Sequence, residues 1–426
     1  MKTVIMAGGA GTRISEAFPN IPKPLIPIEG VPVLEREIRG LKEQGFTDII
    51  LTLSHMADQI ISHFGDGSKL GVNIEYFVEE TPLGNAGALY EIRDLLSDDF
   101  LLLNADTVFD VDFNRFVDFH RKKDALATLF THPNDHPYDS GLIVAGQDLA
   151  VTKWYAKEDD RPKYYKNRVN AGLHVLSKQL IGKRPDTAKV DLDRQLLKPL
   201  AGSGTMFCYD SPEYVRDMGT VDRFKSVCRD FASGKVSSRN LKNRQRAIFL
   251  DRDGTINRYV GFLRSEEEFE LEAGAAEAIR LINASDYLAI VVTNQPVIAR
   301  GEVTFEELEN IHNKMETLLG NKGAYLDGLY FCPHHPDSGF PGEVKALKMD
   351  CMCRKPKPGM LLKAADDLHI DLGASWMVGD GANDMEAGRR AGTKTGLILT
   401  DREKCEDMSD LSGEDLLDVV KQILRR

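Results

Sequence analysis

The sequence predicts an α/β protein with two doubly wound parallel sheets, one in each half of the chain. Two observations support this prediction. Apolar stretches of strand length alternate with amphipathic helical patterns throughout the 426 residues, which is the order of parallel strands connected by helices. In addition, a strand that delivers two carboxylates, Asp251 and Asp253, begins past the middle of the chain. Such a strand usually opens an α/β unit, so a second complete unit is expected.

The expected elements follow the same order in both halves. In the first half, short apolar runs indicate strands, and the spacing of Leu34, Ile38 and Leu41 indicates a helix. The first half is expected to contain strands at 3–7, 48–53 and 100–106, and helices around 34–41 and 57–64. The second half is expected to contain strands at 247–250, 288–292, 328–331, 375–378 and 396–399, and helices around 275–282, 305–319, 360–369, 383–390 and 416–423.

A segment without apolar periodicity separates the halves. Residues 226–246 gather arginine and lysine side chains. Such a run of basic residues could bind phosphate or nucleic acid, but it is more often a solvated linker or a solvated helix face. We therefore place a first domain at 1–232, a linker at 233–246 and a second domain at 247–426. At about 150 residues per domain, the length accommodates both.

The composition is that of a globular protein, with 42% apolar and 28% charged residues. A net charge of -12 argues against nucleic acid as a partner, although it permits a small phosphorylated ligand held by local cations. The chain enters its first strand without a signal-like leader, and its apolar stretches are too short to span a bilayer. We expect a cytoplasmic protein without a membrane partner. The oligomeric state stays open, a homo-oligomer included.

A glycine-rich loop follows the first expected strand. Gly8, Gly9 and Gly11 allow backbone N–H groups to approach a phosphate, Arg13 adds a cation, and Lys23 stands between two prolines. A glycine loop alone is as consistent with a tight turn, whereas G-G-A-G-T-R followed by P-K-P is more specific. The loop lacks the G-K-[ST] of a P-loop and the spacing of a dinucleotide fingerprint.

This pattern resembles the sugar-1-phosphate nucleotidylyltransferases, a Rossmann-like family that joins a nucleoside triphosphate to a sugar 1-phosphate. The resemblance implies that Arg13 and Lys23 hold the triphosphate as catalytic residues, and that Asp106 and Asp217 bind Mg²⁺. Ala156 replaces a family glutamate, which leaves Lys157 or Glu158 as a sugar contact. The implied nucleotide contacts are Gly8, Gly9, Gly11, Thr12, Pro82, Gly84 and Asn85, and the implied sugar contacts are Lys157, Asn170 and Gly172.

Four polar clusters follow successive strands of the second half. The first cluster contains Asp251 and Asp253, and the second contains Thr293, Asn294 and Gln295. The third contains Arg354 and Lys355, and the fourth contains Asp380 with Asp384. Because the carboxyl ends of parallel strands meet at one edge of a sheet, these groups would surround one phosphoryl group.

The four-part order resembles the haloacid dehalogenase (HAD) superfamily, with D-x-D-G-T as its most specific part. The resemblance implies that Asp251 is a nucleophile that forms an aspartyl phosphate, and that Asp253 is the general acid and base. Lys355 would neutralise the intermediate. Further phosphate contacts would come from Thr293, Asn294, Arg300 and Arg354, and Mg²⁺ would be bound by Asp251, Asp253 and Asp380.

A cysteine and histidine cluster lies between the second and third of these groups. Three thiolates and one imidazole, in two close pairs, fit a closed tetrahedral Zn²⁺ site, although reduced structural cysteines are the alternative. The resembled family uses C-x-H, which selects His334 over His335. The expected structural Zn²⁺ ligands are Cys332, His334, Cys351 and Cys353. Little sequence remains for a separate cap domain.

The motifs T-N-Q-x-x-I-A-R-G and C-P-H-H-P…C-x-C-R-K-P-x-P-G-M resemble the D-glycero-D-manno-heptose 1,7-bisphosphate 7-phosphatases. Removing the 7-phosphate leaves a heptose 1-phosphate, which is the substrate type of the first half. The hypothesis is a bifunctional enzyme of GDP-heptose biosynthesis that uses GTP, with only small molecules as partners. The alternative is a mannose-1-phosphate guanylyltransferase or another hexose-1-phosphate nucleotidylyltransferase, fused to a histidinol-phosphatase-like or other sugar phosphatase. A non-catalytic sensor half is disfavoured because both halves keep their acids.

Overall fold

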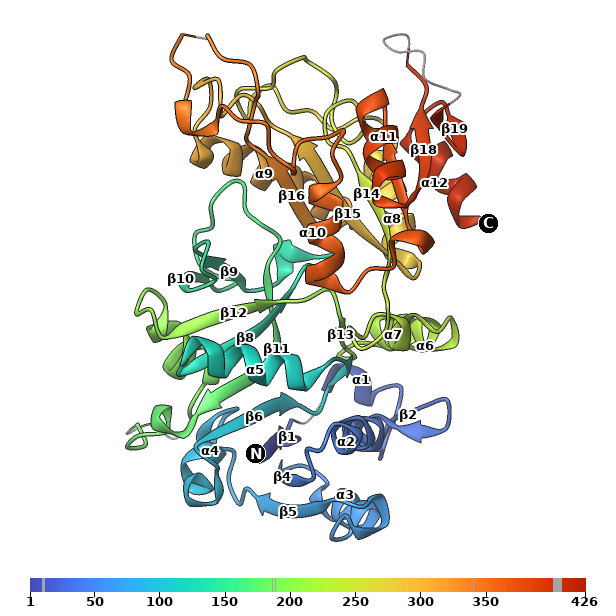
Figure 1. Ribbon diagram of the computed structural model, residues 1–426. Coiled ribbons are helices and arrows are strands. Elements are labelled where there is room, and N and C mark those ends of the chain that lie inside the picture. The colour runs from blue at the N-terminus through green and yellow to red at the C-terminus, as the bar shows by residue number, and fades with distance from the viewer. Residues whose placement is uncertain (10–11, 186, 188, 340, 401–407) are drawn as a thin grey trace. The chain divides into compact units, whose positions relative to one another are not determined.

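The computed structural model describes residues 1–9, 12–185, 187, 189–339, 341–400 and 408–426 (Figure 1). Contacts divide the chain into two compact units. The first consists of Met1–His132, Ile143–Ala156 and Asn170–Asn240, and the second of Pro133–Leu142, Lys157–Val169 and Leu241–Arg426. Both units are α/β, which confirms the predicted fold class. The chain changes unit more than once, and its last passage, between Asn240 and Leu241, falls inside the segment predicted as a linker.

The main sheet of the first unit has the strand order β10-β9-β11-β6-β1-β4-β5, and β8 pairs with both β11 and β12. Its central pairs, β1 with β4, β1 with β6 and β4 with β5, are parallel. Strand β11 instead pairs antiparallel with β6 and β9, so this sheet is mixed and not parallel throughout as predicted. The strands are β1 (Thr3–Met6), β4 (Asp48–Leu53), β5 (Asn73–Val78), β6 (Asp99–Asn104), β8 (Ala127–His132), β9 (Leu142–Ala145), β10 (Val151–Tyr155), β11 (Val169–Ser177) and β12 (Met206–Asp210). Shorter strands form two small antiparallel pairs, β2 (Pro27–Ile28) with β3 (Val31–Pro32), and β7 (Thr107–Asp110) with β13 (Tyr214–Asp217).

Helices cover both faces of this sheet because neighbouring residues of a buried strand point in opposite directions. On β1, Ile5 packs in one core cluster with Leu34 of α2, while Val4 packs in another with Leu89 of α4. The helices are α1 (Thr12–Ser15), α2 (Val33–Glu43), α3 (Ala57–Phe64), α4 (Gly87–Glu91), α5 (Phe113–Lys123), α6 (Val221–Ala232) and α7 (Lys235–Ser238).

The second unit contains a fully parallel six-stranded sheet in the order β16-β15-β14-β17-β18-β19. On β14, Ile248 packs toward α8 and α12, and Phe249 packs toward α10. The strands are β14 (Arg246–Leu250), β15 (Tyr287–Asn294), β16 (Gly328–Cys332), β17 (Trp376–Gly379), β18 (Lys394–Ile398) and β19 (Leu411–Gly413). The helices are α8 (Ala275–Ala284), α9 (Phe305–Gly320), α10 (Gly359–Leu368), α11 (Ala382–Ala391) and α12 (Leu416–Leu424).

Helix α9 begins with a capping box, in which the Thr304 and Glu307 side chains each accept a hydrogen bond from the other residue's backbone N–H. The last turn of α9 holds a segment from the first half of the sequence that belongs to this unit. The Glu316 carboxylate accepts the Asn167 N–H at 2.7 Å, and the Thr317 hydroxyl accepts the Tyr165 N–H at 2.8 Å. Among the described residues, no helix has the length and apolar character needed to cross a membrane.

Candidate functional sites

Carboxylates gather at the carboxyl edge of the sheet in the second unit. Asp251 follows β14 directly, and Asp380 follows β17, the strand that pairs with β14. Oxygens of Asp251, Asp380 and Asp384 all lie within 4.8 Å of one another, an arrangement that can hold a metal ion. Asp384 approaches so closely that a Cβ atom on Gly379 would lie 2.4 Å from its Oδ2, which requires glycine at the end of β17.

Lys355 is buried among these carboxylates. Its Nζ lies 2.7 Å from Asp251 Oδ1 and 2.6 Å from Asp384 Oδ1. Burial raises the pKa of Asp251 to about 6, although the Lys355 charge opposes this rise. Asn294 fixes the Lys355 backbone from the end of β15, because its amide donates to the Lys355 carbonyl and accepts from the Lys355 N–H, both at 3.0 Å. The Asn294 side chain, predicted as a phosphate contact, thus also holds the lysine in place.

Asp253 lies in a separate set of hydrogen bonds. Its carboxylate accepts two bonds of 2.9 Å from Arg252 Nη2, one of 2.9 Å from Gln295 and one of 3.1 Å from Asn257. Burial raises the pKa of Asp253, but these donors outweigh burial and hold the pKa below its usual range. Gln295 also donates to the Thr293 hydroxyl at 2.9 Å. The Asp253 carboxylate is not part of the three-carboxylate group found among the described residues.

Two predicted phosphate contacts make other contacts here. Arg300 donates through Nε to Glu302 at 2.6 Å and lies 4.5 Å from the centre of the Phe262 ring. Arg354 donates to the His334 carbonyl at 3.3 Å, which ties it to the cysteine and histidine cluster.

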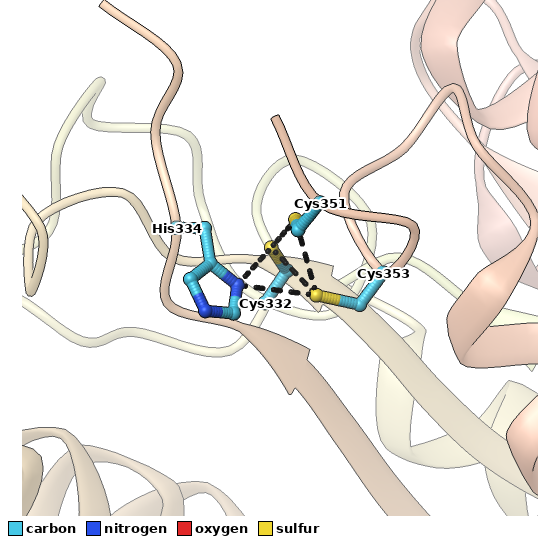
Figure 2. A group of neighbouring side chains, drawn as sticks. All are labelled: Cys332, His334, Cys351 and Cys353. Atoms are coloured by element: carbon cyan, nitrogen blue, oxygen red, sulfur yellow. Dashed lines mark hydrogen bonds between the residues drawn. The ribbon is translucent and has the colours of Figure 1, made fainter. Parts of the chain in front are cut away.

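That cluster contains Cys332, His334, Cys351 and Cys353, whose ligand atoms point toward one another (Figure 2). Sulfur–sulfur distances are 3.2 to 3.5 Å, and His334 Nδ1 lies 3.3 Å from Cys353 Sγ. Tetrahedral Zn²⁺ would separate its thiolates by about 3.7 Å, so little adjustment is needed. The hydrogen bond between Cys353 and Cys332 lowers the pKa of Cys353 to about 5. His335 instead accepts the Asp337 N–H, so it is occupied elsewhere.

The first unit also brings its predicted charged residues together. Lys23 Nζ lies 2.7 Å from Asp106 Oδ2. The Asp106 carbonyl accepts the Met218 N–H at 3.0 Å, which brings the end of β13 beside Asp106. A Cβ atom on Gly219 would lie 2.9 Å from Asp217 Oδ1, 3.4 Å from Arg13 Nη2 and 3.9 Å from Lys23 Nζ. The four predicted catalytic and metal-binding residues therefore converge around Gly219.

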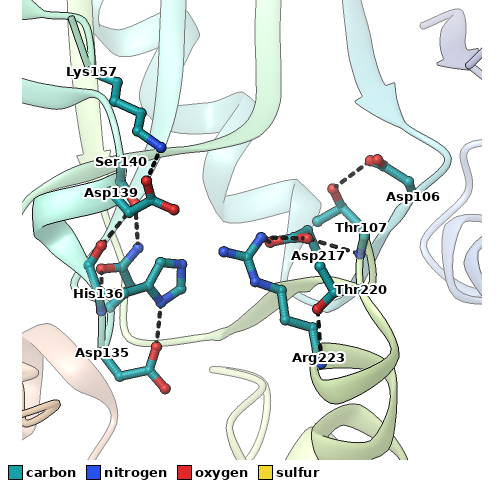
Figure 3. A network of polar contacts seen from close by, with 12 residues as sticks. Asp106, Thr107, Asp135, His136, Asp139, Ser140, Lys157, Asp217, Thr220 and Arg223 are labelled. Atoms are coloured by element: carbon teal, nitrogen blue, oxygen red, sulfur yellow. Dashed lines mark hydrogen bonds and ion pairs between the residues drawn. The ribbon is translucent and has the colours of Figure 1, made fainter. Parts of the chain in front are cut away.

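Arg223, in the first turn of α6, completes this group and was not predicted. It donates to both oxygens of Asp217, at 3.0 and 2.8 Å, and Figure 3 shows its guanidinium pointing toward that carboxylate. Burial raises the pKa of Asp217, but the Gly219 N–H and Arg223 outweigh burial and leave the pKa lowered. The signal in the sequence is an arginine on the first turn of the helix that follows D-M-G-T.

The predicted nucleotide segment contacts the stretch around Val190. Gly84 has a φ of +84°, and a Cβ atom there would lie 2.4 Å from the Val190 carbonyl. Asn85 Oδ1 accepts the Leu192 N–H at 2.7 Å, and Pro82 is exposed. In the glycine loop, a Cβ atom on Gly8 would touch Ser54, one on Gly9 would meet no described atom within 4 Å, Thr12 begins α1, and Gly11 lies outside the described residues.

The predicted sugar contacts fall in both units. Asn170 accepts the Gly172 N–H at 3.2 Å and lies 3.1 Å from His174 Nε2. Gly172 adopts a φ of +77°, and a Cβ atom there would lie 2.5 Å from Asn104 Nδ2. Lys157 belongs to the second unit, and its ammonium pairs with Asp139 (Figure 3).

Comparison with known proteins finds relatives of both halves of the chain. Residues 2–233, more than half of the chain, match the nucleotidyl transferase family, and residues 352–423 match the HAD-hydrolase-like family. A D-glycero-beta-D-manno-heptose-1,7-bisphosphate 7-phosphatase of Salmonella typhi is 44% identical over 153 residues, which cover 36% of this chain and 79% of the relative. The chain belongs to both the nucleotidyl transferases and the family of these phosphatases.

The phosphatase half also matches the enzyme of the same name from Pasteurella multocida, with 43% identity over 164 residues that cover 38% of this chain and 86% of the relative. The nucleotidyl transferase half is similar to the crystal structure of HddC from Yersinia pseudotuberculosis, which is 27% identical over 54% of this chain and 99% of that chain, with a TM-score of 0.47.

Three residues of the phosphatase half were given no individual role from the sequence, although two of them, Gln295 and Asp384, belong to the predicted polar clusters. Asp384, four residues after Asp380, was visible in the sequence beside a predicted ligand. Gln295 directly follows the predicted Thr293 and Asn294. Arg252 stands between Asp251 and Asp253 in the sequence, and nothing in the pattern indicated that its side chain turns inward to Asp253.

Proposed function

We propose that the chain is a bifunctional, cytoplasmic enzyme that removes the 7-phosphate from D-glycero-D-manno-heptose 1,7-bisphosphate and then transfers a guanylyl group from GTP to the heptose 1-phosphate. The 44% identity to a phosphatase of that name, in a chain that also carries a nucleotidyl transferase, supports this proposal most strongly. The phosphatase names favour a heptose over the hexose alternative. The domain boundaries at 232 and 247 remain part of the proposal.

In the phosphatase, a carboxylate oxygen of Asp251 attacks the 7-phosphorus, and the bond from phosphorus to the sugar oxygen breaks. Asp253 gives the departing oxygen a proton. The charge of the bound phosphoryl group opposes the lowering effect of Arg252 and so favours proton uptake by Asp253. Asp253 then accepts a proton from the water that attacks the aspartyl phosphate, which releases inorganic phosphate. Lys355, within 2.7 Å of Asp251, offsets the negative charge throughout.

In the nucleotidyl transferase, an oxygen of the sugar 1-phosphate attacks the α-phosphorus of GTP, and pyrophosphate leaves. Arg13 and Lys23, which both lie near Gly219, would neutralise the charge of the triphosphate, and no covalent nucleophile of the protein is needed. The segment from Pro82 to Asn85 would contact the base and ribose. Asn170 and Gly172 would contact the sugar.

The donor atoms fit the implied metals. Oxygens of Asp251, Asp380 and Asp384 suit Mg²⁺. Asp106 and Asp217 are carboxylates of the kind that binds Mg²⁺ together with phosphate oxygens. When bound, Mg²⁺ would neutralise phosphate charge in both halves. The four-residue cysteine and histidine set suits structural Zn²⁺.

A paired assay tests the proposal. Purified protein with the 1,7-bisphosphate alone should release one phosphate per sugar and no pyrophosphate. Addition of GTP should then yield pyrophosphate and a GDP-sugar. Parallel reactions with ATP, UTP and CTP test the base. Phosphate release without pyrophosphate from any nucleotide would disprove the coupled function.

A further inference from the structure

His312 lies in the core of the second unit, on the face of α9 directed at the loop after β14. It is only 7% exposed, and its Nε2 atom lies 3.2 Å from Nη1 of Arg252. Its ring also packs against Phe331, with ring centres 5.7 Å apart. The histidine thus meets the side of the guanidinium that faces away from the catalytic carboxylate.

Arg252 connects His312 to Asp253. The Arg252 side chain is fully buried. Its Nη2 donates hydrogen bonds to both carboxylate oxygens of Asp253 at 2.9 Å, and its Nε donates to Oδ1 at 3.2 Å. A guanidinium is a rigid planar fork, so an acceptor on Nη1 fixes the direction in which Nη2 and Nε point. A buried donor without an acceptor would cost about 1–3 kcal/mol, and His312 supplies the acceptor for Nη1.

The charge state of His312 agrees with this direction of bonding. Burial, together with the positive charges of Arg252 and Lys166, holds the pKa of His312 well below its usual range. The ring is therefore neutral, and Nε2 can accept the proton that Nη1 donates.

We propose that His312 is a positioning residue of the phosphatase, which orients Arg252 and thereby holds Asp253 in place for proton transfer to the leaving oxygen. The inference rests on the phosphatase reaction proposed above. General acid catalysis requires hydrogen-bond geometry between acid and leaving group, so loss of orientation lowers the rate even when the acid itself is intact.

The leaving group provides a readout that a merely structural role would not move. A sugar alkoxide needs a proton to depart, whereas p-nitrophenolate departs without one. The parameter kcat/KM reports the step in which Asp251 is phosphorylated, so it isolates this requirement from hydrolysis of the intermediate. Loss of acid positioning should therefore slow the sugar substrate far more than the aryl substrate.

A matched pair of variants tests the role. His312→Met and His312→Gln have similar volumes, but only glutamine offers an oxygen acceptor to Arg252. We expect His312→Met to lower kcat/KM for the heptose bisphosphate about 10- to 100-fold, and for p-nitrophenyl phosphate by less than about threefold. His312→Gln should recover most of the loss. Met315→Leu, a volume-conserving change at a buried position one turn along α9, should match the wild type.

Three results would overturn the inference. These are an equal fall on both substrates, wild-type activity in His312→Met, or no recovery in His312→Gln. Circular dichroism and thermal unfolding check that each variant folds. If His312→Met does not fold, His312→Phe, which keeps a ring but has no acceptor, takes its place. A wild-type protein inactive on the heptose bisphosphate would instead count against the proposed function.

Discussion

The Nζ atom of Lys355 lies 2.7 Å from Oδ1 of Asp251, so the predicted nucleophile and a buried cation are in direct contact. Burial acts to lower the pKa of Lys355, but the charges of Asp251 and Asp384 outweigh burial and raise the pKa. The ammonium of Lys355 therefore stays charged beside Asp251 and Asp384. The contact to Asp384, at 2.6 Å, makes that residue part of the same charged group.

Replacing Asp384 should impair the phosphatase selectively. Asp384→Asn removes one of the two carboxylates on Lys355 and one of the three grouped oxygens. We expect phosphate release to fall about 100-fold and the Mg²⁺ concentration for half-maximal activity to rise, as measured in a Mg²⁺ titration. Glu386→Gln, which removes an exposed pair with Arg390 on the same helix, is the control. An unchanged Mg²⁺ dependence in Asp384→Asn would contradict this role.

Replacing Arg223 should impair only the nucleotidyl transferase. Arg223→Ala removes the guanidinium that holds both oxygens of Asp217. We expect pyrophosphate release to fall about tenfold or more, while phosphate release from the bisphosphate stays at the wild-type rate. Arg39→Ala, which breaks an exposed pair with Glu35, should leave both activities unchanged. Equal losses in Arg223→Ala and Arg39→Ala would show that Arg223 acts only through the surface charge.

The cysteine and histidine cluster predicts a bound metal that can be counted. Elemental analysis of the wild type should find about one Zn²⁺ per chain. Cys351→Ser should lose most of it and unfold at a lower temperature, because metal binding stabilises the folded state. Cys228→Ser, at a cysteine outside the cluster, should keep its metal. A wild type without zinc would refute the assignment.

His174 predicts an acid-sensitive first unit. Burial lowers the pKa of His174 to about 4, below the usual value of 6.5. Between these values the unfolded chain takes up a proton that the folded unit excludes. The free energy of unfolding should therefore have its highest value above pH 6.5. It should fall by up to about 3 kcal/mol as the pH drops toward 4. Denaturant titrations between pH 7 and 4.5 measure this slope, and His174→Gln should reduce it. The same slope in wild type and variant would exclude His174 as its source.

Much of both sites could be predicted because parallel strands fix where their carboxyl ends lie. Asp251 and Asp380 follow adjacent strands, so a shared edge brings them together whatever the loops do. Asp106 was expected from the family resemblance, and the register of β1 with β6, from Thr3 to Met6, brings it near the end of β1.

The remaining contacts depend on packing that leaves no local pattern. His312 is one of several apolar-facing positions on α9, and its contact with Arg252 spans 60 residues. The segment Lys157–Val169 lies within the predicted first domain, 1–232. It nevertheless belongs to the second unit, where Glu316 and Thr317 accept hydrogen bonds from its backbone. Neither result follows from periodicity or spacing, because each requires the tertiary arrangement of distant elements.

The measurement that most directly tests the bifunctional account uses Asp251→Asn in the coupled reaction. With heptose 1,7-bisphosphate and GTP, this variant should release neither phosphate nor pyrophosphate. Heptose 1-phosphate, added in place of the bisphosphate, should restore pyrophosphate release to the wild-type rate. Pyrophosphate release from the bisphosphate by Asp251→Asn, or failure of heptose 1-phosphate to restore it, would contradict the proposed order of the two reactions.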